Sequence, residues 1–182
     1  MNARTFVAGM ALCALPGLIP SAQAAPFRSH GRGEPQVARC IRDAADGHLW
    51  LEKTLWGLRD QEGGWLGAEV ANADGSHDLG PLQVNSWWVA KLAAATGRPA
   101  VHIRHWLIHD ACFNVDTARW IFLAALRSTK DYWKAIGVYH SPTGWRQRCY
   151  IANVASRLKA RFGSTVFGPS HVGGQRPGTA GQ

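Results

Sequence analysis

Acidic residues are scarce in this chain of 182 residues, which has 12 Asp and Glu against 20 Lys and Arg and a formal net charge of +8. The shortage of negative charge indicates a polyanionic partner, such as nucleic acid, an anionic membrane or the acidic bacterial wall. The Lys and Arg are scattered and form no stripe, so nucleic-acid binding has little support. A basic surface that serves only solubility is the plain alternative.

Cysteines are also few, and their spacing does not resemble a zinc site, because no Cys-x-x-Cys pair occurs. Nothing in the sequence predicts a metal or an organic cofactor. Cys13 lies in the N-terminal apolar segment, which leaves Cys40, Cys112 and Cys149 for the body of the chain. In an oxidising compartment these three permit one disulfide and leave one thiol over.

The chain has no apolar run that makes a good membrane span, so no stable membrane insertion is expected. Residues 1–25 have the features of an export signal instead: Arg4, an apolar stretch broken by Pro16, and small residues before a cleavage point after Ala24 or Ala25. An uncleaved anchor is the alternative. Cleavage removes Arg4 and no acid, which leaves a net charge of +7. We therefore expect a periplasmic protein, for which wall polymers are the leading partner.

The composition predicts one globular domain with tails. Hydrophobic residues make up 46% of the chain and charged residues 18%, which is enough apolar material for a core. Residues 26–35 are polar and are interpreted as a flexible leader, residues 36–162 as the domain, and the Gly-rich residues 163–182 as a disordered tail. The nine tryptophans fit either a core or a groove lined with flat apolar rings.

Most of the domain shows the apolar periodicity of helices. The expected helices span residues 36–45, 48–61, 87–95, 99–108, 114–127, 131–138 and 145–161. The pattern is lost in the Gly-rich and Asp-rich residues 63–80, where Asp74-Gly75 predicts a small hairpin. Asn85 or Ser86 is expected to cap the third helix. The prediction is a mainly α domain with one small irregular or hairpin insertion.

Glu62 stands out because a carboxylate has the wrong polarity for its position. It continues the apolar stripe of Leu51, Leu55 and Leu58 along one helix face. Burial and the helix C-terminus both disfavour its charged form and raise its pKa, which suits a general acid near neutral pH. Gly63 and the glycine after it let the chain turn and leave the carboxyl facing a cleft. A solvated Glu at a frayed helix end is the alternative.

Four blocks in this order resemble the lytic transglycosylase domain: Glu62, DLGPLQVNSWW at 78–88, DACFNV at 110–115 and WKAIGVYHS at 133–141. The match covers about residues 36–160 and is most similar to the small specialised enzymes of conjugation, type III and type IV secretion and pilus systems. The resemblance implies a lysozyme-like, goose-type helical fold. It also implies cleavage between N-acetylmuramic acid and N-acetylglucosamine with formation of a 1,6-anhydro ring, with Glu62 as acid and then base.

The resemblance carries over to further residues one at a time. Gln83 matches the glutamine of the family's Gly-Leu-Met-Gln motif and is expected to bind sugar, with a structural amide as the alternative. Tyr139 matches the tyrosine of the Tyr-Asn-Ala-Gly motif, whose hydroxyl could hold Glu62; an ordinary core tyrosine is the alternative. Gly63 stands where many relatives have Ser, and His140 where they have Asn, so the substrate contacts differ there.

The resemblance also implies a Cys40–Cys112 disulfide, with Cys112–Cys149 as the alternative. The best candidates for a second carboxylate, Glu69 and Asp78, match no catalytic acid of the family. The expected partners are peptidoglycan glycan strands and components of a secretion or conjugation machine. A hydrolytic muramidase and a catalytically idle glycan-binding component of such a machine are the competing functions.

Overall fold

The computed structural model describes residues 33–167. The predicted export signal, most of the predicted leader and residues 168–182 of the predicted tail lie outside the described residues. Helices take up 71% of the described part, which confirms the mainly α class. The helices are α1 (Glu34–Ala45), α2 (Leu49–Glu62), α3 (Trp88–Thr96), α4 (Ala100–His109), α5 (Ala111–Thr129), α6 (Tyr132–His140), α7 (Gly144–Phe162) and the short 3-10 helix η1 (Ser164–Phe167).

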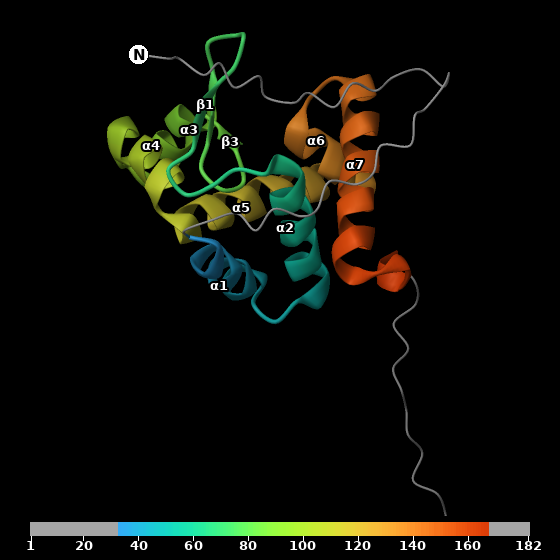
Figure 1. The fold of residues 1–182 in the computed structure, drawn as a ribbon. Coiled ribbons are helices and arrows are strands. Elements are labelled where there is room, and N and C mark those ends of the chain that lie inside the picture. Colours follow the sequence, from blue (N-terminus) through green and yellow to red (C-terminus); the bar gives the residue numbers. More distant parts are fainter. Residues whose placement is uncertain (1–32, 168–182) are drawn as a thin grey trace, which may run out of the picture. The chain divides into compact units, whose positions relative to one another are not determined.

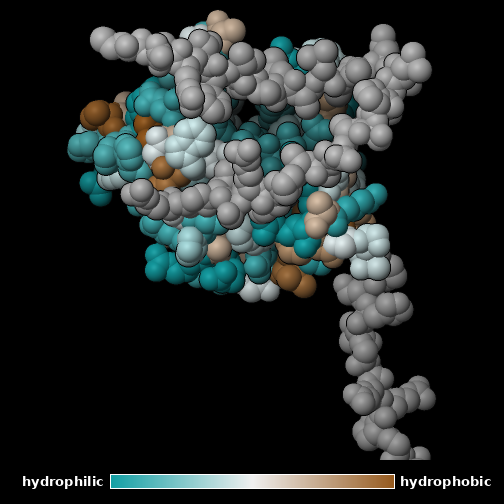
Figure 2. Space-filling view, in the orientation of Figure 1, coloured by the Kyte–Doolittle hydropathy of each residue, from teal (hydrophilic) through white to brown (hydrophobic). Residues whose placement is uncertain are grey.

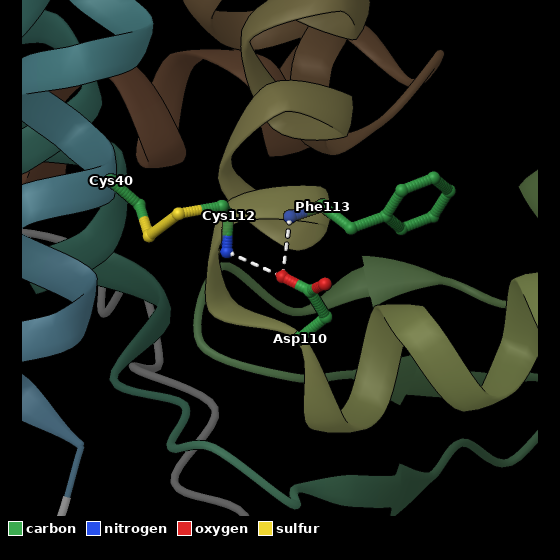
Figure 3. The surroundings of a disulfide bond; sticks show 4 residues. All are labelled: Cys40, Asp110, Cys112 and Phe113. Atoms are coloured by element: carbon green, nitrogen blue, oxygen red, sulfur yellow. Dashed lines mark hydrogen bonds between the residues drawn. A yellow bond between two sulfur atoms is a disulfide. The ribbon is translucent and has the colours of Figure 1, made fainter.

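Every expected helix is present, and the differences lie at the helix ends. α1 begins at Glu34, before the predicted start at residue 36, because Pro35 fits the first turn, where a missing N–H costs nothing. α5 begins at Ala111, before the predicted start at residue 114. Its N-cap is Asp110, whose carboxylate accepts hydrogen bonds from the backbone N–H groups of Cys112 and Phe113 (Figure 3).

Helix α5 lies at the centre of the packing (Figure 1), in contact with α1, α2, α4 and α6, while α7 packs against α2 and α6. On α5, Val115, Ala118 and Phe122 are fully buried, at the intervals of three and four residues that mark one helix face. On α7, Val154 and Leu158 are buried at the same four-residue interval. The apolar periodicity therefore identified the faces that form the core.

The insertion after α2 forms a small antiparallel sheet in the order β1-β2-β3. Its strands are β1 (Glu69–Ala71), β2 (His77–Leu79) and β3 (Val84–Asn85). The predicted hairpin at Asp74-Gly75 is confirmed, since this turn joins β1 to β2 and Gly75 has the positive φ of 80° that glycine tolerates best. In the β2–β3 ladder Asp78 lies opposite Asn85, which brings their side chains together.

A disulfide joins Cys40 on α1 to Cys112 on α5, with 4.8 Å between the two Cα atoms (Figure 3). This is the pairing that the resemblance implied, and it excludes the alternative Cys112–Cys149 bridge. Cys149 is not a free thiol in the structure. The expectation that one thiol is left over is therefore wrong.

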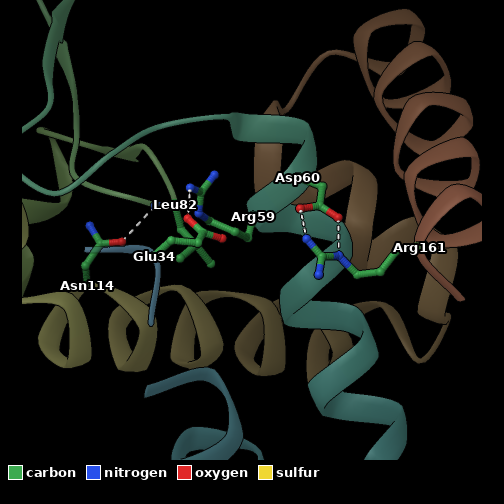
Figure 4. Close-up of polar contacts among 6 residues, drawn as sticks. All are labelled: Glu34, Arg59, Asp60, Leu82, Asn114 and Arg161. Carbon is green, nitrogen blue, oxygen red and sulfur yellow. Dashed lines mark hydrogen bonds and ion pairs between the residues drawn. The ribbon is translucent and has the colours of Figure 1, made fainter. Parts of the chain in front are cut away.

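A fully buried asparagine fixes the connection between β2 and β3 (Figure 4). The side-chain oxygen of Asn114 accepts a hydrogen bond from the backbone N–H of Leu82 at 2.9 Å. Its amide nitrogen donates to the carbonyl oxygens of Leu79 at 2.8 Å and Leu107 at 2.9 Å. Because each of these groups is buried, losing the Asn114 amide would leave several polar atoms unpaired.

Two consecutive residues of α2 form ion pairs with opposite ends of the domain (Figure 4). Arg59 pairs with Glu34 of α1 at 2.7 Å. Asp60 accepts two hydrogen bonds from Arg161 of α7, at 2.5 and 2.7 Å. The last turn of α2 is thus held from both sides by charge-assisted hydrogen bonds.

Candidate active site

Helix α2 carries Glu62 as its last residue. The predicted stripe is confirmed, since Leu51, Leu55 and Leu58 are all buried, and Glu62 lies one turn further on with partial exposure. The helix ends at Gly63, whose φ of 62° lies in the left-handed region. A Cβ at Gly63 would meet no atom within 4 Å, so the chain is open to solvent at this point.

Burial raises the pKa of Glu62 to about 8. The residue keeps some contact with solvent, yet protein atoms surround its carboxyl so closely that desolvation outweighs the other influences. A hydrogen bond from Tyr150 lowers the pKa, and the negative charge of Asp78 raises it further. At neutral pH Glu62 therefore holds a proton that it can donate, as a general acid must.

The hydroxyl that holds Glu62 is that of Tyr150, which donates to Oε1 of Glu62 at 2.5 Å. Tyr150 lies on α7 and is only 4% exposed. It precedes Val154 and Leu158 at intervals of four residues, and the three form the buried face of the helix. The sequence analysis did not single out Tyr150, although its four-residue spacing from Val154 and Leu158 was the signal that could have revealed it.

His140, at the end of α6, lies flat on the ring of Tyr150. The ring centroids are 4.4 Å apart and the ring planes differ by 4°. Although the residue as a whole is exposed, partial burial of its ring lowers the pKa of His140. The positive charge of Arg146 lowers this pKa further, and the negative charge of Asp78 opposes both effects. His140 therefore contacts the side chain that holds Glu62.

Tyr139 does not have the contact that the sequence analysis assigned to it. Its hydroxyl donates to the carbonyl oxygen of Leu82 at 3.0 Å, whereas Glu62 accepts its hydrogen bond from Tyr150. Tyr139 is nevertheless close enough to Glu62 to feel its charge. Burial is the larger cause, and the charge of Glu62 the second, that raises the pKa of Tyr139 well above its usual value. The two tyrosines thus hold different parts of the site: Tyr150 the acid, and Tyr139 the loop before Gln83.

Gln83 lies against the chain that follows Glu62. A Cβ at Gly64 would come within 2.8 Å of Nε2 of Gln83 and 2.3 Å of the carbonyl oxygen of Gly80, so only glycine fits there. The backbone of Gln83 has a φ of 47°, in the left-handed region that non-glycine residues seldom adopt. Its amide donates to the carbonyl oxygen of Gly80 at 2.8 Å, which orients the side chain.

Asp78 is a second carboxyl group near Glu62. It is partly buried, and the amide of Asn85 donates to its Oδ1 at 3.0 Å. Burial raises the pKa of Asp78, while amide hydrogen bonds lower it. Glu69, the other candidate, is exposed and forms an ion pair with Arg104. Of the two candidates, Asp78 is therefore the one that the structure brings to the acid.

The structure brings the five predicted site residues to one region, around the ends of α2 and α6 and the β2–β3 connection, through the contacts of Gln83 with Gly64, of Tyr139 with the charge of Glu62, and of His140 with Tyr150. These residues are Glu62, Gly63, Gln83, Tyr139 and His140. Within residues 33–167, no group of three or more His, Cys, Asp and Glu side chains could hold a metal ion. No helix in the same range is both long and apolar enough to cross a membrane.

No protein-family model, curated protein or solved structure matches the chain. The grounds for a function are therefore the four sequence blocks and the chemistry around Glu62. That chemistry consists of a protonated carboxyl, a tyrosine that orients it, a second carboxyl whose charge acts on it, and the Gln83 amide against the chain two residues further on.

Proposed function

We propose that the protein is a peptidoglycan lytic transglycosylase with a lysozyme-like, goose-type fold and that Glu62 is its catalytic acid. The observation that carries this proposal is the pKa of about 8 of Glu62, since a carboxyl group that keeps its proton at neutral pH can protonate a glycosidic oxygen. Tyr139 lies close enough to Glu62 for the charge of that carboxyl to raise its pKa, and Gln83 lies against Gly64, two residues after Glu62. Both add support, because these residues belong to separate blocks of the family resemblance.

In the proposed reaction Glu62 transfers its proton to the oxygen between N-acetylmuramic acid and N-acetylglucosamine, and the bond from the muramyl C1 to that oxygen breaks. The substrate's own N-acetyl group stabilises the positive charge at C1. The Glu62 carboxylate then accepts the proton of the muramyl C6 hydroxyl as its oxygen bonds to C1, which closes the 1,6-anhydro ring. Tyr150 holds Oε1 of Glu62 through both steps.

Hydrolysis by a muramidase is the second candidate, and the position of Asp78 favours it. Glycosidases that use water commonly need two carboxyl groups at the scissile bond. Asp78 lies close enough to Glu62 to raise its pKa. In this alternative the Asp78 carboxylate would activate water, and the product would carry a free reducing end.

The proposed setting is the periplasm, where the enzyme would open the wall for a secretion or conjugation apparatus. The basic composition supports this setting, because wall polymers are acidic. A binding component with an idle site is the third candidate. It is favoured by Gly63, which offers no hydroxyl beside the acid, and by His140, which stands in the place of an amide.

The test is digestion of purified peptidoglycan by the wild-type protein and by Glu62→Gln, with mass spectrometry of the products. Gln keeps the shape of the side chain and cannot donate the carboxyl proton. Anhydro-muropeptides from the wild type and none from the variant are expected. Products with free reducing ends would favour hydrolysis, and an absence of products despite binding to the wall would favour the binding component.

A further inference from the structure

A group of three tryptophans and one lysine, of which only Trp88 is partly buried, lies at the start of α3 and on α5. We call it the tryptophan–lysine surface; it consists of Trp87, Trp88, Lys91 and Trp120. Trp87 is 52% exposed and Trp120 is 44% exposed, large fractions for such apolar side chains. Figure 2 shows hydrophobic residues reaching the surface on the side where Figure 1 places α3 and α4.

The rings of this surface are fixed by one another. The centroids of Trp87 and Trp88 are 4.4 Å apart with planes inclined by 25°, and those of Trp88 and Trp120 are 5.4 Å apart with planes at 83°. Nζ of Lys91 lies 4.4 Å from the Trp87 centroid and 4.6 Å from the Trp88 centroid. Such contacts hold the ammonium group by attraction to the ring faces. The surface is therefore preorganised before any ligand arrives.

Lys91 is a cation held by aromatic rings and not by a carboxylate. The ion pairs among residues 33–167 are Glu34–Arg59, Glu69–Arg104 and Asp60–Arg161, and none includes Lys91. No acidic residue occurs between Asp78 and Asp110. If Lys91 served only to cover the apolar rings with its aliphatic stem, the rings would be shielded from solvent. Half of Trp87 is exposed instead. The surface thus offers an anion-binding ammonium beside a flat apolar face.

Two hydrogen bonds and one charge interaction link this surface to the site around Glu62. The backbone N–H of Trp87 donates to Oδ1 of Asn85 at 3.1 Å, and Nδ2 of Asn85 donates to Asp78 at 3.0 Å. Asp78 in turn is close enough to Glu62 for their charges to interact. A polymer bound at Glu62 that extends past Asn85 would reach the tryptophan–lysine surface.

We propose that Trp87, Trp88 and Lys91 form a subsite that binds a sugar residue carrying an acidic peptide. An indole face packs on the sugar ring, and the ammonium of Lys91 pairs with a carboxylate of the peptide. This inference rests on the proposed function, because it extends the glycan bound at Glu62. It makes peptide-bearing peptidoglycan strands, and not bare glycan, the preferred substrate class.

The test measures binding in the Glu62→Gln background, so that no strand is cut during the titration. The probes are soluble glycan strands that carry stem peptides and the same strands after enzymatic removal of those peptides. Lys91→Gln should weaken binding of the peptide-bearing strands about tenfold, the value of one charge-assisted contact, and leave binding of bare strands unchanged. Arg98→Gln is the matched control, because it removes one exposed positive charge from the same acid-free segment.

Trp87→Ala should weaken binding of both probes, whereas Trp87→Phe, which keeps a flat ring, should retain most of it. Equal effects of Lys91→Gln and Arg98→Gln, or no loss for Trp87→Ala, would overturn the inference, as would a Glu62→Gln protein that binds neither probe. If Trp87→Ala does not fold, binding by Lys91→Gln and Trp87→Phe tests the subsite. The two proposals can fail separately. If the wild-type protein makes no anhydro products but the Glu62→Gln variants show the expected binding pattern, the proposed reaction is refuted and the subsite is supported.

Discussion

The hydroxyl of Tyr150 lies 2.5 Å from Oε1 of Glu62, although 88 residues separate the two in the sequence. The contact joins α7 to the last residue of α2 and opposes the effect of burial on the pKa of Glu62. One side chain therefore both orients the acid and limits how firmly it keeps its proton.

Replacing Tyr150 by Phe removes this hydrogen bond and should raise the pKa of Glu62 further above its present value of about 8. If activity needs the protonated acid, the alkaline limb of the pH–rate profile should move up by about one pH unit, since the net strength of such a bond is about 1 to 2 kcal/mol. Digestion of peptidoglycan across pH 6 to 10 measures the limb. Tyr139→Phe is the control, because its hydroxyl donates to Leu82; a shift of equal size in both variants would contradict the assignment.

Glu62→Gln should make the folded state more stable at alkaline pH. The pKa of Glu62 is raised on folding from 4.5 to about 8, so the wild type loses stability as pH rises from 4.5 to about 8, by about 5 kcal/mol at most. A neutral Gln does not suffer this loss. Urea unfolding at pH 5 and pH 8 should show a gap between variant and wild type that widens with pH. Glu69→Gln is the control: Glu69 is exposed and ion-paired, so its replacement should change the free energy of unfolding little at either pH. A difference between Glu62→Gln and wild type that does not vary with pH would refute the raised pKa of Glu62.

The two glycines after Glu62 should respond differently to substitution. Gly63→Ser meets open space and is expected to fold, at a cost of about 1 kcal/mol for its positive φ. Gly64→Ala brings a Cβ within 2.3 Å of a carbonyl oxygen and should lose more stability and the activity together. Urea unfolding and product analysis of both variants test this contrast. Equal stability of the two variants would show that the loop at Gly80 yields easily.

Removing the disulfide should destabilise the domain without altering the acid. Cys40 and Cys112 are 72 residues apart, so their bridge limits the unfolded chain and contributes on the order of 4 kcal/mol by the entropy model. The double variant Cys40→Ala, Cys112→Ala should unfold at lower urea concentration, while its alkaline pH limb stays in place. A midpoint equal to that of the oxidised wild type would show that other contacts already hold α1 on α5.

Local sequence patterns were sufficient to predict the helices and the hairpin. Apolar spacing identified the buried stripe ending at Glu62, and Asp74-Gly75 identified the turn between β1 and β2. These features depend on residues within one or two helical turns or one tight turn, where periodicity and turn chemistry act directly.

The partners of the acid could not be obtained in this way. The Tyr150–Glu62 hydrogen bond and the place of Asp78 beside Glu62 depend on how distant segments pack, which no local pattern specifies. The resemblance pointed to Tyr139 because that tyrosine lies in a recognisable motif. The structure gives the contact to Tyr150, whose own motif is only a four-residue spacing on the last helix.

The ion pairs on Arg59 and Asp60 make the acid dependent on a complete chain. Neighbouring residues of the turn that carries Glu62 are bound to Glu34 at one end of the domain and to Arg161 at the other. A chain without α7 would lack both Arg161 and Tyr150, the two residues of that helix that hold this turn. The position of the Glu62 carboxyl therefore depends on a helix that lies 88 residues further along the chain.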